Sequence, residues 1–141
     1  MGLDNGIIIT IKDSKKFGRI PKWIRRSEWD IKHNSIELNY WRKCWNVRDE
    51  IFDYINKNSC PAVDEYQEFE YELNIDDVLS ILKQIKDNLY SAKKWNNSDS
   101  IWKWNEVKQH YKYNLRKAQK ILKWLKRKSV DSYQITFYDS Y

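Results

Sequence analysis

The sequence predicts an α+β fold in a single domain over residues 1–141, with three main helices packed on a small antiparallel sheet. Two observations support this prediction. Both ends of the chain carry short segments typical of strands, and the middle carries longer segments with the spacing of amphipathic helices. The N- and C-terminal strands, among about three in all, are expected to pair antiparallel at the centre of the sheet, with the helices on one face.

The first strand is clear, whereas the segment after it is hard to assign. Residues 6–12 (GIIITIK) form a continuous β-branched run, which is typical of a buried strand. A turn is expected over residues 13–18. Residues 19–36 show no dominant period. Pro21 could open a short helix, and an irregular excursion fits equally well.

The most informative helical pattern covers residues 38–57. Because an α-helix turns about 100° per residue, four aromatic residues would face the core on one arc: Tyr40, Trp41, Trp45 and Phe52. Arg48 projects into the middle of that arc, where a guanidinium needs a partner. Two interpretations stay open. One is an internal salt bridge to one of the chain's many acids, for example Glu68, Glu70 or Glu72, and the other is a pocket arginine for a phosphate or a stacked base.

The second half of the chain predicts a strand, two helices and a final strand. Residues 68–73 alternate aromatic and acidic side chains, Asn74 is a helix-capping residue, and a long helix is expected over residues 100–128 before a strand over residues 130–138. The apolar stripes of the two helices are Val78, Ile81, Leu82, Ile85 and Leu89 in the first, and Trp104, Val107, Tyr111, Leu115, Ala118, Leu122 and Leu125 in the second.

Charge is segregated along the chain, whose formal net charge is +6. Residues 103–128 hold ten Lys or Arg and one acid, whereas residues 49–77 hold ten acids and one Lys. If the two segments lie on separate faces, the basic one favours anionic partners; otherwise the two segments dock on each other or the basic face is simply solvated. The residues predicted for nucleic-acid binding are Lys112, Arg116, Lys120, Lys123, Trp124 and Arg127.

No motif of a catalytic or metal site occurs in the sequence. His33 and His110 are isolated, no zinc-type spacing is present, and three glycines cannot supply a phosphate-binding glycine-rich loop. We therefore predict no catalytic residues, no metal and no cofactor, and binding is favoured over catalysis. No run of residues approaches the roughly 18 apolar positions of a membrane span, so a cytoplasmic protein without a membrane partner is expected. The oligomeric state stays open, a homo-oligomer included.

Two stretches resemble a family of short bacteriophage and prophage proteins. The chain begins MGLDNG, and residues 39–55 read NYWRKCWNVRDEIFDYI. Family members open with a Met-Gly-Leu-Asp run, carry a Tyr-Trp-Arg-Lys helix start and often end in an aromatic-rich strand, as residues 137–141 would here. Members mostly carry no assigned activity. The resemblance therefore implies a phage origin and a location in the host bacterial cytoplasm more than it implies a function.

That resemblance would bring the two terminal strands and the predicted helix start together. A helix N-terminus readily binds anions, so an aromatic and cationic pocket is expected there. The predicted ligand-binding residues are Tyr40, Trp41, Arg42, Lys43, Arg48, Asp4, Asn5 and Tyr138. In the alternative interpretation, the N-terminal run is a structural plug and Arg42 pairs with Asp4 or Asp49.

Three functions are consistent with these patterns. The first is a small non-enzymatic phage protein that binds an anionic, nucleotide-like ligand, such as a host immune signal that it would sequester. The second is nucleic-acid binding through the basic face of the long helix. The third is inhibition of a host factor by protein–protein contact.

Overall fold

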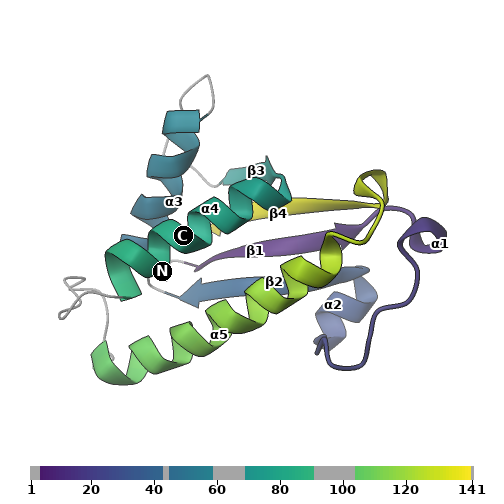
Figure 1. Cartoon of the computed structure of the whole chain (residues 1–141), viewed down its shortest axis with the longest axis horizontal. Helices are drawn as coiled ribbons and strands as arrows, with labels where there is room; N and C mark the ends of the chain where they lie inside the picture. Colours follow the sequence, from purple (N-terminus) through teal and green to yellow (C-terminus); the bar gives the residue numbers. More distant parts are fainter. Residues whose placement is uncertain (1–3, 43–44, 59–68, 91–103, 141) are drawn as a thin grey trace.

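Four antiparallel strands form the sheet around which the chain is organised (Figure 1). The computed structural model describes residues 4–42, 45–58, 69–90 and 104–140. The strands are β1 (Asp4–Ile11), β2 (Ser35–Arg42), β3 (Phe69–Leu73) and β4 (Tyr133–Ser140), in the order β2-β1-β4-β3. The two terminal strands pair antiparallel at the centre, with Ile9 opposite Ile135. The predicted pairing of the chain ends is therefore confirmed.

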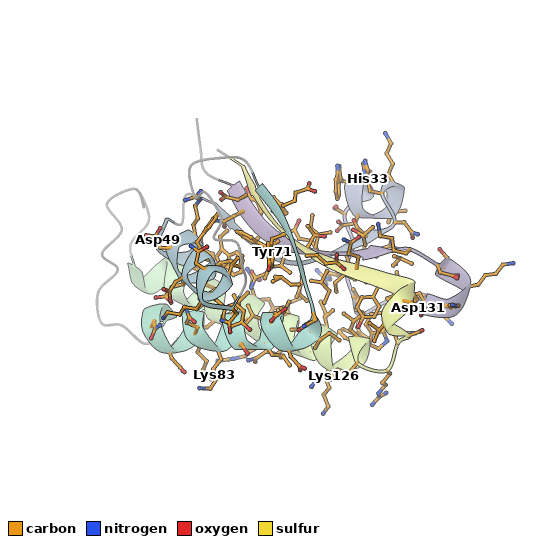
Figure 2. All side chains as sticks on the ribbon, turned by 90° about the horizontal axis from the view of Figure 1, so that it is seen from above. His33, Asp49, Tyr71, Lys83, Lys126 and Asp131 are labelled. Atoms are coloured by element: carbon orange, nitrogen blue, oxygen red, sulfur yellow. The ribbon has the colours of Figure 1, made fainter. Side chains whose placement is uncertain are left out.

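Three helices longer than two turns accompany the sheet in the described part of the chain. They are α3 (Trp45–Asn58), α4 (Ile75–Ile85), which continues into a π-helical turn over Lys86–Tyr90, and α5 (Trp104–Leu125). Two short helices, α1 (Ser14–Phe17) and α2 (Glu28–Lys32), and a 3₁₀ turn over Val130–Ser132 complete the described elements. In Figure 2, α4 and α5 lie on one side of the sheet and the short helix before His33 on the other. The predicted α+β class is confirmed.

The hydrophobic core fills the space between the sheet and its three long helices. Alternate residues of β1 and β4, among them Ile7, Ile9 and Phe137, are fully buried because strand side chains alternate between faces. The Phe137 ring meets Phe52 of α3 edge to face, with centroids 6.0 Å apart. The described members of both predicted helical stripes are buried: Val78, Ile81, Leu82 and Ile85 in α4, and Tyr111, Leu115, Ala118, Leu122 and Leu125 in α5.

The predicted helix over residues 38–57 is wrong at residues 38–42. Residues 35–42 form β2, and α3 begins only at Trp45. A β-bulge explains the error: Ile7 pairs with Asn39 and Ile8 with Glu37, so Leu38 is an extra residue in β2. The bulge interrupts the period of two that would mark a strand, and a helical spacing of aromatics is all that remains visible.

The segment before β2 contains two short helices where a turn and an unassigned stretch were expected. Asp13 caps α1 by accepting hydrogen bonds from the backbone N–H groups of Lys15 and Lys16. Ser27 caps α2 in a reciprocal capping box with Asp30. Short helices of this kind leave little periodicity in the sequence, because one turn of chain shows only one or two buried positions.

The predicted cap of α4 is confirmed. The Asn74 side chain accepts a hydrogen bond from the Asp77 N–H at 2.7 Å, and the Asp77 side chain accepts one from the Asn74 N–H. None of the helices in the described part of the chain combines the length and the apolar character needed to cross a membrane.

Candidate functional site: a cationic and aromatic cleft beside the long helix

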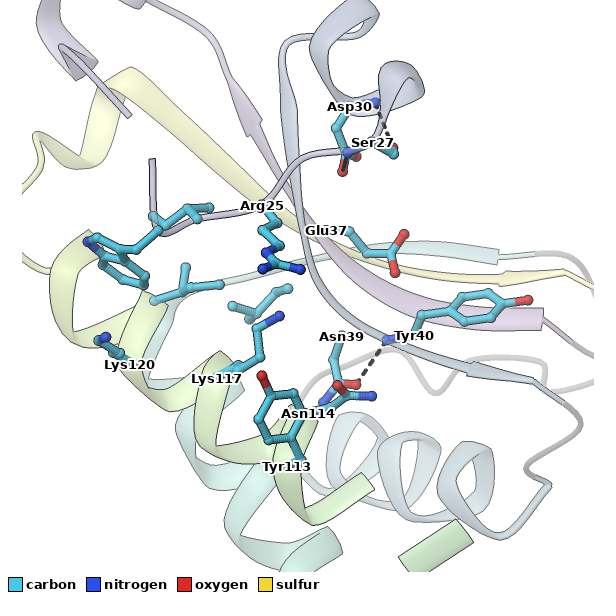
Figure 3. Close-up of a pocket in the computed structure, with 14 residues that line it drawn as sticks. Arg25, Ser27, Asp30, Glu37, Asn39, Tyr40, Tyr113, Asn114, Lys117 and Lys120 are labelled. Atoms are coloured by element: carbon cyan, nitrogen blue, oxygen red, sulfur yellow. Dashed lines mark hydrogen bonds between the residues drawn. The ribbon is translucent and has the colours of Figure 1, made fainter. Parts of the chain in front are cut away.

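A cleft of about 500 Å³ lies between α5, β2 and the chain segment that precedes α2 (Figure 3). Three cations line it, Arg25 from that segment and Lys117 and Lys120 from α5. Figure 3 shows Arg25 and Lys117 pointing toward one another from opposite walls. Two like charges that face each other repel. An anion between them would turn that repulsion into two attractions.

Aromatic rings stand beside these cations. The Lys120 Nζ atom lies 4.5 Å from the centroid of the Trp23 ring, and the Lys117 Nζ atom lies 5.6 Å from that of Tyr113. Both distances fall within the range of cation–π attraction. The Trp23 side chain is 41% exposed and that of Tyr113 is 59% exposed. Both rings therefore keep surface on which a planar group could stack.

The wall that carries Trp23 and Arg25 is fixed to the rest of the fold. Ile24 lies between them and is buried in the core, which turns its two neighbours outward. The Arg26 guanidinium donates to the Ser35 carbonyl oxygen of β2 at 2.9 Å and to the Asp30 carbonyl oxygen at 3.3 Å. The cleft is thus formed before any ligand arrives, as is usual for binding pockets.

Two carboxylates also line the cleft, and they differ in availability. Asp30 is buried and accepts hydrogen bonds from the Ser27 backbone N–H and the Ser35 hydroxyl. Glu37 lies at the rim, where its side chain as a whole is exposed. Burial of its carboxyl group among neighbouring atoms nevertheless raises the pKa of Glu37, and the charge of Asp30 raises it further.

None of the three cations of the cleft forms an ion pair with another described residue. Each of the ion pairs found among the described residues joins other residues, and none uses Arg25, Lys117 or Lys120. The cleft therefore combines three such cations with two carboxylates, one of them already engaged in hydrogen bonds. A small anion with a planar group matches this surface better than a cation does.

Three of the residues predicted from sequence to bind a ligand lie in the core instead. Trp41 and Asn5 face each other across β2 and β1 and are fully buried. Arg48 is buried as well, and its Nε donates to the Asp139 carboxylate at 2.7 Å. The salt-bridge interpretation of Arg48 is confirmed, although the partner is Asp139 and not Glu70 or Glu72. Glu68 lies outside the described residues.

The Arg48–Asp139 pair is the charged centre of a buried junction between the sheet and α3. Burial raises the pKa of the Asp139 carboxyl, and the hydrogen bond and charge of Arg48 oppose that rise. The Arg48 guanidinium also lies over the Phe52 ring, 4.4 Å from its centroid. These contacts occupy the arginine inside the protein, so it does not reach the cleft.

Two other predicted residues lie on or near the surface. Tyr40 lines the cleft and is part of β2. Tyr138 is half-buried on the sheet face that the long helices leave uncovered, opposite Glu70. The side chains of Asp4, Arg42 and Lys43 are outside the described part of the structure, although the register pairs the backbones of Asp4 and Arg42. Among the described residues that line the cleft, Tyr40 is the one member of the predicted ligand-binding set.

The predicted basic ridge runs along the outer side of α5. Arg116, Lys120, Lys123 and Arg127 are exposed, and Lys112 is half-buried. Trp124 is half-buried because its ring packs edge to face on Phe17, with centroids 5.5 Å apart and Lys128 over both rings. Lys120 is the one ridge residue among the described cleft-lining residues, so the ridge and the cleft meet at that side chain.

A second hollow, of about 930 Å³, lies on the uncovered face of the sheet. Glu37, Glu70 and Glu72 line it, and Lys12 is the one lysine or arginine among its described lining residues. Its carboxylates would repel an anion, so this hollow does not suit the anionic ligand predicted from the sequence. Among the residues described, no group of three or more His, Cys, Asp or Glu side chains is placed to hold a metal ion.

Sequence reasoning missed Trp23, Arg25 and Lys117 as site residues. They come from segments about ninety positions apart, and no local pattern connects such segments. One weak signal in the sequence could have pointed to Lys117. Tyr113 lies at the margin of the predicted basic ridge, and Lys117 follows it by one helical turn, so the two side chains lie on the same side of the helix. No protein-family model, curated protein or solved structure matches the chain.

Proposed function

We propose that the protein binds a small anionic, nucleotide-like ligand in the cleft between α5 and the segment before α2. The observation that carries this proposal is the orientation of Arg25 and Lys117, which face each other across the cleft without a carboxylate partner among the described residues. A phosphate between them would receive charge-assisted hydrogen bonds from both walls.

The accessible rings of Trp23 and Tyr113 extend the proposal from a bare anion to a nucleotide. A base has a planar face that stacks on aromatic side chains, whatever its sequence identity. The cleft volume of about 500 Å³ is of the size that encloses a ligand of this class. Binding without chemistry would serve sequestration of a phosphate-containing signal, in keeping with the phage origin implied by the family resemblance.

Isothermal titration calorimetry with the purified protein tests the proposal. The ligands are nucleoside mono- and diphosphates, 3′,5′-cyclic nucleotides and ADP-ribose. We expect at least one to bind, and Arg25→Ala and Lys117→Ala each to weaken it about tenfold or more, because each removes a charge-assisted hydrogen bond. Lys123→Ala is the matched control, since it removes the same charge from α5 outside the cleft.

The results that would contradict the proposal are distinct. Absence of binding across the whole panel would reject a nucleotide-like ligand. A loss of affinity in Lys123→Ala as large as in Lys117→Ala would mean that the protein's overall charge, and not the cleft, determines binding. Thermal unfolding of each variant shows whether a loss of binding is a loss of fold.

A second candidate function is nucleic-acid binding along the ridge. The observation that favours it is a row of exposed cations on α5, none of which joins an ion pair among described residues. Binding should then fall steeply with salt, because each phosphate contact releases counterions. Lys123→Glu with Arg127→Glu would abolish such binding and leave nucleotide binding in the cleft nearly unchanged. Arg25→Ala would do the reverse.

A further inference from the structure

Asn39 lies at the cleft and carries a buried hydrogen-bond donor that no described residue pairs with. Its side chain lines the cleft, and the residue is only 4% exposed. The Asn39 Oδ1 atom accepts a hydrogen bond from the Tyr40 backbone N–H at 2.9 Å, drawn as a dashed line in Figure 3. An oxygen is required at that position because the partner is a donor. This hydrogen bond fixes the orientation of the amide, so that Nδ2 points away from the Tyr40 N–H.

The Asn39 Nδ2 group has no acceptor among the described residues. Buried polar groups in folded proteins are nearly always hydrogen-bonded, so an unpaired one calls for an explanation. A bound water is the simplest explanation. The second explanation is an acceptor on a ligand in the adjoining cleft. The β-bulge in the backbone of β2 favours this second explanation.

The β-bulge in β2 determines where Asn39 points. Side chains of a regular strand alternate between the two faces of the sheet. Leu38 is the extra residue, so Asn39 pairs with Ile7 and turns to the side covered by α5. Without that insertion it would lie on the opposite face of the sheet. Bulges frequently re-aim a side chain next to a functional site.

We propose that Asn39 is a specificity-determining residue that reads the base of the ligand. The ligand would be a nucleotide, held by its phosphate between Arg25 and Lys117 and by a carbonyl or ring-nitrogen acceptor of its base at Asn39 Nδ2. This inference rests on the proposed function and narrows the ligand class, since inorganic phosphate and a sugar phosphate have no base to offer an acceptor to the Asn39 donor. Base edges offer such acceptors to amide side chains.

The test compares the four 5′-ribonucleoside monophosphates with ribose 5-phosphate, which carries the phosphate without a base. We expect the wild-type protein to bind at least one nucleotide about tenfold or more tightly than ribose 5-phosphate, because the base adds a hydrogen bond with Asn39 and stacking on Trp23 and Tyr113. Asn39→Ala should reduce that ratio about tenfold and leave the affinity for ribose 5-phosphate within about twofold. Lys117→Ala should lower the affinity for both compounds and leave the ratio of the two affinities unchanged.

Asn39→Asp separates the donor from the acceptor of the same side chain. It retains an oxygen for the Tyr40 N–H and removes the N–H donors. Its added negative charge should lower the affinity for both the nucleotide and ribose 5-phosphate. Loss of the donor should reduce the ratio of the two affinities, as in Asn39→Ala. A ratio that stays at the wild-type value in both variants would overturn the inference and leave a bound water as the partner of Nδ2. Failure of the wild-type protein to bind any of these compounds would reject the proposed function itself.

Measurements on the wild-type protein keep the inference testable if the variants do not fold. In a ¹⁵N-resolved NMR spectrum, the Asn39 side-chain amide signals should shift when a nucleotide binds and should move much less with ribose 5-phosphate. Equal shifts with both compounds, or none with the nucleotide, would contradict a role in reading the base.

Discussion

Arg48 and Asp139 form an ion pair of opposite charges in the core. The contribution of each charge to the free energy of unfolding depends on the presence of the other. A buried charge is tolerated when it is paired, and loss of one partner leaves the other without compensation. We expect Arg48→Met to lower the free energy of unfolding by about 3–5 kcal/mol, measured by urea denaturation. The double variant Arg48→Met with Asp139→Leu should regain part of that loss. Strictly additive effects of the two substitutions would contradict a coupled pair.

Gly6 illustrates a residue whose lack of a side chain is required by its neighbours. A Cβ atom at this position would lie 2.8 Å from the Asn39 carbonyl oxygen and 2.8 Å from the Tyr138 hydroxyl. The carbonyl belongs to the paired strand β2, so it cannot move aside without disturbing the sheet. Gly6→Ala should lower the free energy of unfolding by about 1–3 kcal/mol.

The two parts of that clash can be separated by urea denaturation in two backgrounds. Tyr138→Ala removes the hydroxyl and ring contacts and leaves the Asn39 carbonyl in place. Gly6→Ala should therefore remain destabilising in the Tyr138→Ala background, by less than in the wild-type protein. A free energy of unfolding unchanged by Gly6→Ala in both backgrounds would show that the strand moves without cost.

Among the elements, α4 and α5 were predictable and β2 was not. Both helices follow a regular apolar stripe, and Asn74 carries an N-cap signal that the structure confirms. In β2 the bulge at Leu38 places Leu38 and Asn39 in succession on the buried side, so the alternation expected of a strand disappears. The candidate cleft depends on that same strand. Sequence reasoning therefore reached the cleft through Tyr40 of β2 and Lys120 of α5, and missed the wall that carries Arg25.

The N-terminus of α4 is held by the Asn74–Asp77 capping box and by a second contact. The Tyr54 hydroxyl of α3 donates to the Asp77 carboxylate at 2.9 Å, so one aspartate joins two helices. Asn74→Ala should lower the free energy of unfolding by about 1 kcal/mol, because it leaves the Asp77 N–H without its cap. Lys83→Ala is a suitable control, since the exposed Lys83–Asp87 pair contributes about 0.3–0.5 kcal/mol. Equal effects of the two substitutions in urea denaturation would argue against the cap.

At the scale of the whole molecule, the described charges lie around two hollows, and Glu37 is the one charged residue that lines both. Arg25 and two cations of α5, Lys117 and Lys120, line the cleft, whereas Glu70 and Glu72 lie on the uncovered face of the sheet. Glu37 lines both hollows and stands at the junction. The segregation seen along the sequence thus reappears in space, and the protonation state of Glu37 should influence what the cleft accepts.

The affinity of the cleft for an anion should accordingly depend on pH. Burial and the nearby charge of Asp30 raise the pKa of Glu37, so its carboxylate gains a proton at a higher pH than an ordinary glutamate does. Ionised Glu37 repels an anion, and protonated Glu37 does not. Affinity should therefore increase as the pH falls through that raised pKa.

Calorimetry with a 3′,5′-cyclic nucleotide, from about pH 7.5 to about pH 4.5, measures this dependence. A phosphodiester keeps one negative charge across the range, so the titration of the ligand's phosphate does not contribute. Glu37→Gln should bind more tightly than the wild-type protein at neutral pH and should lose most of the pH dependence, while Glu72→Gln, which removes an equal charge away from the cleft, should retain it. If the pH profile persists in Glu37→Gln, another group controls the cleft, and the contact between its acidic and basic sides is not the determinant of ligand affinity.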